Sequence, residues 1–262
     1  MDLQLEGKRA IVTGGSRGLG KSMARQLARE GCDVAIGART ESTLKAAAEE
    51  LAKETGRKIV PFVLDVNDLD SIKAFVKGGA DALGGIDIVI NNAAQPGGTQ
   101  GDIEEIDEDG LLWDFTQKAV GYLRVAREAI PYMKQAGWGR IINISGLQAR
   151  NPGTGVSAAA RNGALIAMNK AWANALGKYG ITVNAIYPGS RTVTERTVDQ
   201  AAAENKTLEE KIRELDERAV QRHHPTGDDL GYFAAFLASP LAIGMTGEAI
   251  AVAAGQTIDV HY

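Results

Sequence analysis

The feature that most constrains this chain is a regular alternation of short apolar runs with longer segments of helical period. Each run has the length of a strand and is apolar on both faces, which is typical of parallel strands covered by helices on both sides. Right-handed crossovers between such strands give a doubly wound sheet. We therefore predict one α/β domain over residues 1–262, with a seven-stranded parallel sheet and helices on both faces. The predicted strands are Arg9–Thr13, Cys32–Ala38, Lys58–Leu64, Ile86–Asn91, Gly139–Ile144, Ile181–Ile186 and Glu248–Val252.

One segment departs from this alternation. Residues 190–228 are polar, charged and mostly helix-forming, and they follow the sixth predicted strand. Their apolar residues are spaced as a single stripe, formed by Leu208, Ile212, Leu215 and Val220. We predict a helical lid over the crevice at the carboxyl ends of the strands, and a solvated surface helix is the alternative.

Composition excludes several classes of partner. Hydrophobic residues make up 44% of the chain and the net charge is −4, so we expect neither nucleic acid nor a membrane surface as a partner. The single cysteine, Cys32, cannot form an internal disulfide. No spacing of Cys, His and carboxylates is typical of a metal site. We expect a cytoplasmic protein without a bound metal.

A glycine-rich turn follows the first predicted strand and opens the first predicted helix. Glycines there permit a tight turn and let backbone N–H groups approach a pyrophosphate, while the helix N-terminus supplies partial positive charge. The alternative is a tight strand–helix turn without a ligand. The predicted phosphate-binding residues are Gly14, Ser16, Arg17, Gly18, Leu19 and Gly20.

The end of the second predicted strand indicates which dinucleotide is preferred. An Asp or Glu there would accept hydrogen bonds from the adenosine ribose, but this chain reads Gly37-Ala38-Arg39-Thr40. Arg39, helped by Arg17, would pair with a 2′-phosphate through charge-assisted hydrogen bonds. The sequence therefore favours NADP(H) over NAD(H).

These motifs, taken in order, resemble those of the short-chain dehydrogenase/reductase family, whose fold is of the Rossmann type. The glycine turn is similar to the family's TGxxxGxG motif, and Thr246-Gly247-Glu248 resembles its closing strand. The resemblance implies further contacts with the cofactor. They fall on Asp65 and Val66, on Asn92, Ala93 and Ala94, and on Pro188 and Gly189.

The family's catalytic residues are Asn, Ser, Tyr and Lys, and all four positions are substituted here. The resemblance puts Ser157 at the Tyr position, Arg161 at the Lys position and Lys118 at the Asn position. The Ser position falls on Gly146, with Ser145 one residue earlier.

A family Thr that holds the nicotinamide carboxamide is also replaced. Val193 stands at its position, between Thr192 and Thr194.

These substitutions disfavour the usual carbonyl reduction. A serine hydroxyl is a poor acid or base near neutral pH, and a guanidinium does not release its proton. We interpret Ser157 as the N-cap of the following helix. Whether Lys118 is solvated or projects into the crevice stays open, and His223 or His224 is an alternative base or part of a surface turn.

Three functions therefore remain open. The first is a non-catalytic subunit that associates with an active paralogue, through a helix whose surface carries Leu165, Met168 and Trp172. Without such a partner, we expect a homodimer or homotetramer. The second is an atypical NAD(P)-dependent oxidoreductase acting on a carbonyl or hydroxyl substrate, with a substitute acid such as Lys118. The third is a non-redox enzyme or a cofactor-sensing protein on the same fold.

Overall fold

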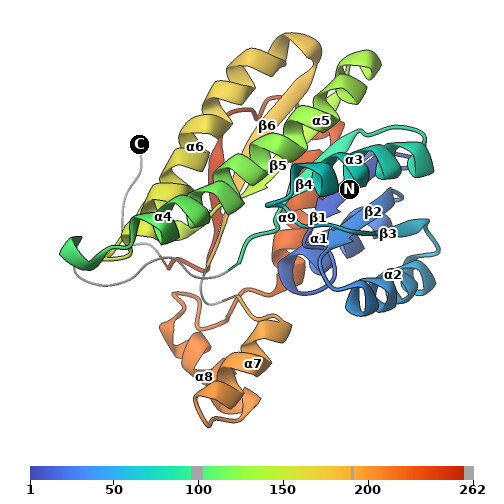
Figure 1. Ribbon diagram of the computed structural model, residues 1–262. Coiled ribbons are helices and arrows are strands. Elements are labelled where there is room, and N and C mark those ends of the chain that lie inside the picture. Colours follow the sequence, from blue (N-terminus) through green and yellow to red (C-terminus); the bar gives the residue numbers. More distant parts are fainter. Residues whose placement is uncertain (96–102, 190–191, 257–262) are drawn as a thin grey trace.

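The computed structural model describes residues 1–95, 103–189 and 192–256, and its centre is a parallel sheet of seven strands (Figure 1). The strand order is β3-β2-β1-β4-β5-β6-β7, and every pairing is parallel. The strands are β1 Arg9–Thr13, β2 Asp33–Ala38, β3 Ile59–Val63, β4 Ile88–Asn91, β5 Gly139–Ile144, β6 Ile181–Pro188 and β7 Ala249–Val252. The predicted fold and all seven predicted strands are confirmed.

The sheet has a separate apolar core on each face. Along β1, Val12 belongs to one core and the preceding Ile11 to the other, because successive side chains of a strand point to opposite faces. Along β2, Ala35 and Ile36 divide between the two cores in the same way. This two-sided burial is the physical reason why the strands read as continuous apolar runs.

Three helices cover each face of the sheet (Figure 1). One face carries α1 Gly18–Arg29, α2 Glu41–Thr55 and α9 Gly227–Ala238, and the other carries α3 Leu69–Leu83, α5 Gly121–Ala136 and α6 Val156–Leu176. The helix α4 Glu108–Phe115 leads through a π-helical turn, Thr116–Val120, into α5.

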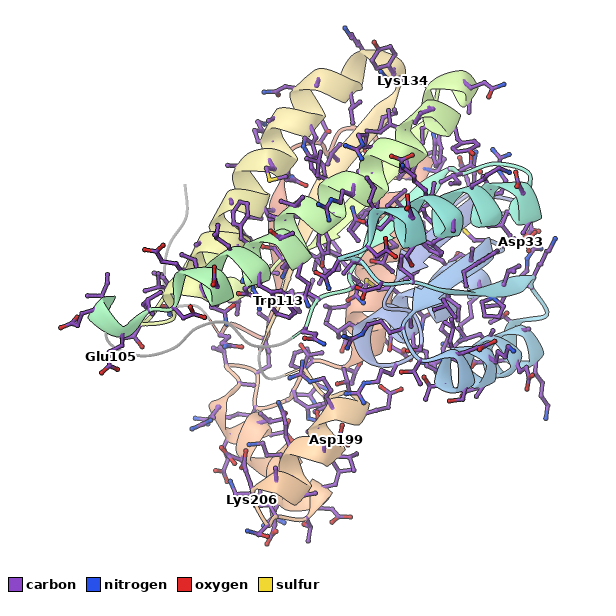
Figure 2. The ribbon with its side chains drawn as sticks, in the orientation of Figure 1. Asp33, Glu105, Trp113, Lys134, Asp199 and Lys206 are labelled. Atoms are coloured by element: carbon purple, nitrogen blue, oxygen red, sulfur yellow. The ribbon has the colours of Figure 1, made fainter. Side chains whose placement is uncertain are left out.

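The surface predicted on α6 needs correction. Leu165 is fully buried within the chain, and Trp172 is partly buried against the core below α6. Large apolar side chains are exposed instead on α4 and α5, where Leu112, Trp113 and Leu123 reach solvent. Trp113 is labelled in Figure 2.

The strand order reverses direction at β1, which lies between β2 and β4. Ligands of open α/β sheets bind at the carboxyl ends of the strands at such a switch point. The turn after β1 and the loop after β4 meet there.

The predicted lid segment contains two helices, α7 Glu195–Ala203 and α8 Leu208–Arg218, and the first three residues of the predicted apolar stripe belong to α8. In Figure 1 they form a lobe set apart from the layered body. Leu215 is buried, but Val220 lies beyond the end of α8 and is exposed. The side chain of Thr207 caps α8 by accepting from Glu210 N, so α8 begins as a helix separate from α7. The first residues of the predicted lid, Ser190 and Arg191, lie outside the described residues.

Candidate functional site

The glycine turn after β1 is tightly packed against the loop after β4. A Cβ on Gly20 would lie 2.1 Å from Gly14 O, and one on Gly14 would lie 2.8 Å from Asn92 Nδ2. Gly14 also has a φ of +70°, which favours glycine. At both positions a Cβ would lie closer than 3.0 Å to a neighbouring atom, so the packing of the turn requires glycine.

Hydrogen bonds hold the two loops together. Thr13 Oγ1 accepts from Asn92 N at 2.9 Å and from Ala93 N at 3.0 Å, and Asn92 Nδ2 donates to Thr13 O at 3.0 Å. The structure therefore brings the predicted residues Gly14, Gly20, Asn92 and Ala93 to one place.

The carboxylate of Asp65 is engaged in its own turn. Asp65 Oδ1 accepts from Asn67 N at 2.9 Å and from Asn67 Nδ2 at 3.0 Å. Val66 is buried, and its backbone lies close to Gly121 at the start of α5. Both residues follow the end of β3, and their contact with a cofactor stays a prediction.

Arg39 lies at the end of β2, and Arg17 lies directly before α1. With the Gln95 amide oriented so that its oxygen faces Arg39, the Arg39 guanidinium donates to that oxygen at 2.7 and 2.5 Å. Arg17 pairs with Asp199 of α7 at 3.5 Å. Arg17 thus lies in the turn itself, and Arg39 follows the strand beside it; their role in recognising a phosphate stays a prediction.

Three residues form a buried cluster at the predicted catalytic positions. Asp114 of α4 is fully buried, and its Oδ2 accepts from Ser157 Oγ at 2.5 Å. Its Oδ1 forms an ion pair with Arg161 Nη1. Arg161 also donates to Gln95 O at 3.2 Å, but its Nε is buried without a partner among the described residues.

The interpretation of Ser157 as a helix N-cap is wrong. The helix α6 begins at Val156, its N-cap is Gly155, and the Ser157 hydroxyl points to Asp114. Sequence reasoning missed Asp114, because a single acid on a short helix gives no signal of a partner 43 residues further along the chain.

Lys118 is buried, so it is not a solvated side chain. Its Nζ donates to Ser145 O at 3.0 Å and to Asn162 Oδ1 at 2.7 Å. Burial, and secondarily the positive charge of Arg161, lower the pKa of Lys118 to about 7. The Lys118 amine, which lies beside the cluster, therefore has a pKa suited to proton transfer near neutrality.

Ser145 lies beside Lys118 but does not present its hydroxyl there. The contact with Lys118 is made by Ser145 O, whereas Ser145 Oγ donates to Asn162 O at 3.4 Å. Gly146 packs closely against neighbouring side chains, since a Cβ on it would lie 2.8 Å from Asn162 Nδ2. A serine at position 146 would therefore require the side chains of Gln148 and Asn162 to shift.

A chain of buried asparagines runs below this cluster and was not predicted. Asn91 Nδ2 donates to Asn143 Oδ1 at 2.9 Å, and Asn143 Nδ2 donates to Asn169 Oδ1 at 3.1 Å. Asn169 Nδ2 continues to Glu248 O at 3.3 Å. These hydrogen bonds link β4, β5, α6 and the residue before β7, and Asn91 Oδ1 is buried without a partner among the described residues.

His223 and His224 lie in the return from the lid. His224 Nδ1 contacts Asp216 Oδ1 at 2.8 Å, and the two imidazole rings lie 5.1 Å apart. In the described ranges, no hydrogen bond or ion pair joins either histidine to Lys118 or Asp114.

The segment after β6 offers one polar atom to a ligand. Thr192 Oγ1 is buried and has no partner among the described residues. Thr194 is the N-cap residue of α7, and Val193 N donates to Pro225 O at 2.8 Å. Pro188 ends β6, and a Cβ on Gly189 would lie 2.9 Å from Ala253 Cα.

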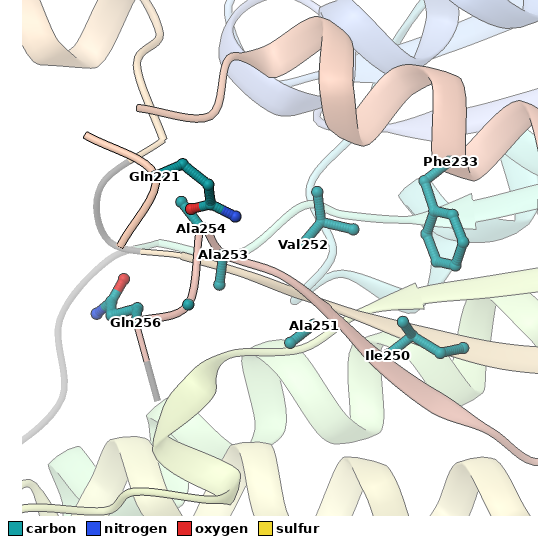
Figure 3. A pocket seen from close by; sticks show the side chains of 9 residues that line it. Gln221, Phe233, Ile250, Ala251, Val252, Ala253, Ala254 and Gln256 are labelled. Atoms are coloured by element: carbon teal, nitrogen blue, oxygen red, sulfur yellow. The ribbon is translucent and has the colours of Figure 1, made fainter. Parts of the chain in front are cut away.

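A separate hollow runs along β7, the strand at one edge of the sheet (Figure 3). Gln221 lies at one end of it and Phe233 at the other, and residues 250–256 form its floor. None of the predicted nucleotide-binding residues lines it. It is therefore a different place from the crevice above β1.

The fold and the glycine turn together define a doubly wound α/β protein of the dinucleotide-binding type. A family model described as enoyl-(acyl carrier protein) reductase matches residues 14–257. The chain is 31% identical to the 3-oxoacyl-[acyl-carrier-protein] reductase FabG of Thermotoga maritima, over 98% of this chain and 100% of the relative. It is 29% identical to the NADPH-dependent reductase BacG of Bacillus subtilis, over 94% and 96%. The chain belongs to the short-chain dehydrogenase/reductase family.

Solved structures support the same assignment. The L-sorbose reductase of Gluconobacter frateurii, in complex with NADPH and L-sorbose, superposes with a TM-score of 0.92 at 27% identity, covering 99% of this chain and 100% of that one. The actinorhodin polyketide ketoreductase with NADPH gives a TM-score of 0.86 at 27% identity, covering 96% and 98%. Both are oxidoreductases in complex with NADPH. In the described part of the chain, no helix is long and apolar enough to cross a membrane.

Proposed function

We propose that this chain binds NADP(H) in the crevice above β1 and does not by itself carry out the proton transfer of its catalytic relatives. The observation that carries this proposal is the buried cluster of Asp114, Ser157 and Arg161. Their side chains are all at least nine-tenths buried, and the carboxylate of Asp114 accepts from the Ser157 hydroxyl and pairs with the Arg161 guanidinium. A hydroxyl committed to a carboxylate is not available to orient or protonate a carbonyl group.

The residues around the crevice fit the cofactor. Amides of the glycine turn would hold the pyrophosphate, Arg39 would hold the 2′-phosphate, and the unpartnered Thr192 Oγ1 would hydrogen-bond the carboxamide. The bound cofactor would supply hydride chemistry. The NADPH-dependence of BacG and the NADPH in the L-sorbose reductase complex support the choice of NADP(H).

In this proposal the chain is a non-catalytic subunit of an assembly with an active member of the family. The exposed Leu112, Trp113 and Leu123 offer apolar contacts on α4 and α5. The active partner would carry Tyr and Lys at the positions of Ser157 and Arg161. Co-purification with such a relative, and loss of the association on Trp113→Glu, would support this role. A stable homo-oligomer that turns over substrate alone would contradict it.

The first test is a titration of the purified chain with NADPH and with NADH, followed by nicotinamide fluorescence. The proposal predicts saturable binding of NADPH, weaker binding of NADH, and no consumption of either with a panel of carbonyl compounds and alcohols. If neither nucleotide binds, either to the wild type or to a variant in which Glu195 is replaced by Gln, the proposal is wrong.

A second candidate function rests on Lys118. Its amine has a pKa of about 7 and lies beside the cluster, so it has the proton affinity of a general acid. Under this alternative the chain is an atypical NADP(H)-dependent oxidoreductase with Lys118 as the proton donor. Turnover by the wild type that is lost in Lys118→Met, with unchanged NADPH binding, would favour it over the first proposal.

A further inference from the structure

The groups predicted to recognise the phosphates of the cofactor are already engaged by other parts of the same chain. Gly18 N donates to Glu195 Oε2 at 2.8 Å, and Arg17 pairs with Asp199 at 3.5 Å. Both acids belong to α7, the first helix of the lid. Asp199 is labelled on this lobe in Figure 2. Arg39 donates to the side chain of Gln95.

The contact of Glu195 with α1 replaces a missing cap. The helix begins at Gly18, its N-cap Arg17 forms no side-chain capping bond, and its first turn contains no acid. The free amides and the helix dipole therefore favour an anion from elsewhere. Glu195 supplies a carboxylate oxygen there, and a pyrophosphate oxygen would make the same kind of contact.

The contact between Arg39 and Gln95 crosses the crevice. Arg39 follows β2 and Gln95 follows β4, and β1 lies between these two strands. The pair therefore spans the carboxyl end of β1. The backbone of Gln95 is held separately, since its N–H donates to Gln117 Oε1 at 2.7 Å and its carbonyl accepts from Arg161. Its side chain can thus leave Arg39 without a shift of the loop.

The start of α7 is anchored to the body of the protein. Val193 N donates to Pro225 O at 2.8 Å, and Gly227 N donates to Val193 O at 3.2 Å. Glu195 lies only two residues beyond this anchor and is exposed. Its carboxylate can therefore withdraw from Gly18 while Val193 stays in place.

We propose that Glu195, Asp199 and Gln95 occupy the positions of the cofactor's phosphates, so that the ligand-free chain closes its own nucleotide site. Binding of NADP(H), on which this inference rests through the proposed function, then requires displacement of these side chains. The pyrophosphate replaces Glu195 at Gly18, and the 2′-phosphate replaces Gln95 at Arg39. The state of α7 is thereby linked to occupancy of the crevice.

Glu195→Gln tests the first replacement, because it keeps the shape of the side chain and removes the competing charge. Both NADPH and NADH carry the pyrophosphate, so both should bind more tightly, by about 5-fold to 30-fold. The matched control is Glu209→Gln, which removes the charge of an exposed acid in the first turn of α8 on the same lid. This control should leave both affinities unchanged.

Gln95→Ala tests the second replacement. It frees Arg39 for the 2′-phosphate, so the affinity for NADPH should rise by about 2-fold to 5-fold while that for NADH stays constant. The variant that combines both substitutions should show the product of the two gains for NADPH, because the contacts are separate.

The results distinguish this inference from the proposed function. If the wild type binds NADPH and Glu195→Gln binds it equally or more weakly, the inference is overturned and the proposed function stands. If Glu195→Gln binds NADPH but the wild type does not, the inference is supported in its strongest form. If the wild type and every variant fail to bind either nucleotide, both are wrong.

Discussion

Replacing Asp114 by asparagine should destabilise the protein strongly, because the carboxylate neutralises a buried guanidinium. Asparagine keeps the shape of the side chain and still accepts from Ser157, but it leaves the charge of Arg161 without its partner. Removing one member of a buried ion pair costs about 3–5 kcal/mol. For a chain of this length, that corresponds to a fall in Tm of roughly 6–20 °C.

The assay is urea unfolding of the wild type and of Asp114→Asn, compared at equal m-values. Asp109→Asn, on the exposed side of the same helix, is the matched control and should change stability by no more than about 0.5 kcal/mol. Asp114→Leu combined with Arg161→Met should recover most of the loss, because it removes both charges together. A cost below about 1 kcal/mol for Asp114→Asn would refute the closed cluster with a buried ion pair, since an open and hydrated site screens such a charge.

Three further predictions concern the turn, the cofactor preference and the buried amine. Gly20→Ala should lower the free energy of unfolding by about 1–3 kcal/mol and weaken NADPH binding at least about tenfold, because the new Cβ meets Gly14 O. Calorimetric titration measures the binding, and an affinity equal to that of the wild type would count against the packed turn. Arg39→Ala should weaken NADPH binding by about 10-fold to 150-fold and leave NADH binding unchanged, and equal losses for both would contradict a role in recognising the 2′-phosphate. Because the pKa of Lys118 is lowered to about 7 in the folded chain, the unfolded chain holds the proton of this amine more readily above pH 7. The free energy of unfolding should therefore rise from about pH 7 towards 10.5, by up to about 1.4 kcal/mol per pH unit from this group. The measurement is the free energy of unfolding of the wild type minus that of Lys118→Met, determined by denaturation at a series of pH values. If this difference does not change with pH, the amine is not buried in its uncharged form.

The sheet was predictable from the sequence because its signal is local. Each strand is apolar on both faces, and each is bounded by turns and helices that the sequence also indicates, so the seven strands could be placed from pattern alone. The two helices of the lid were less predictable. The apolar stripe begins at Leu208, so it indicated α8 but not α7, which ends at Ala203 before the Thr207 cap.

The chemistry of the cluster depends on contacts between distant parts of the chain, which no local pattern reveals. Asp114 meets Arg161 across 47 residues, and Lys118 meets Asn162 across 44. Ser157 shows the consequence. Its sequence context favours a helix cap, but a buried carboxylate from α4 determines where its hydroxyl points. The family resemblance located these positions, and the folded chain supplied their partners.

The most direct test is to mix the purified chain alone with NADPH and each of a broad panel of carbonyl compounds, and to follow the absorbance of NADPH. The NADPH concentration should be one that the fluorescence titration has shown to saturate the site. We predict a saturated site and a flat trace, because the hydroxyl of Ser157 and the guanidinium of Arg161 are held by Asp114. Oxidation of NADPH by the chain alone would contradict this claim. Loss of that oxidation in Lys118→Met would then identify the buried amine as the proton donor.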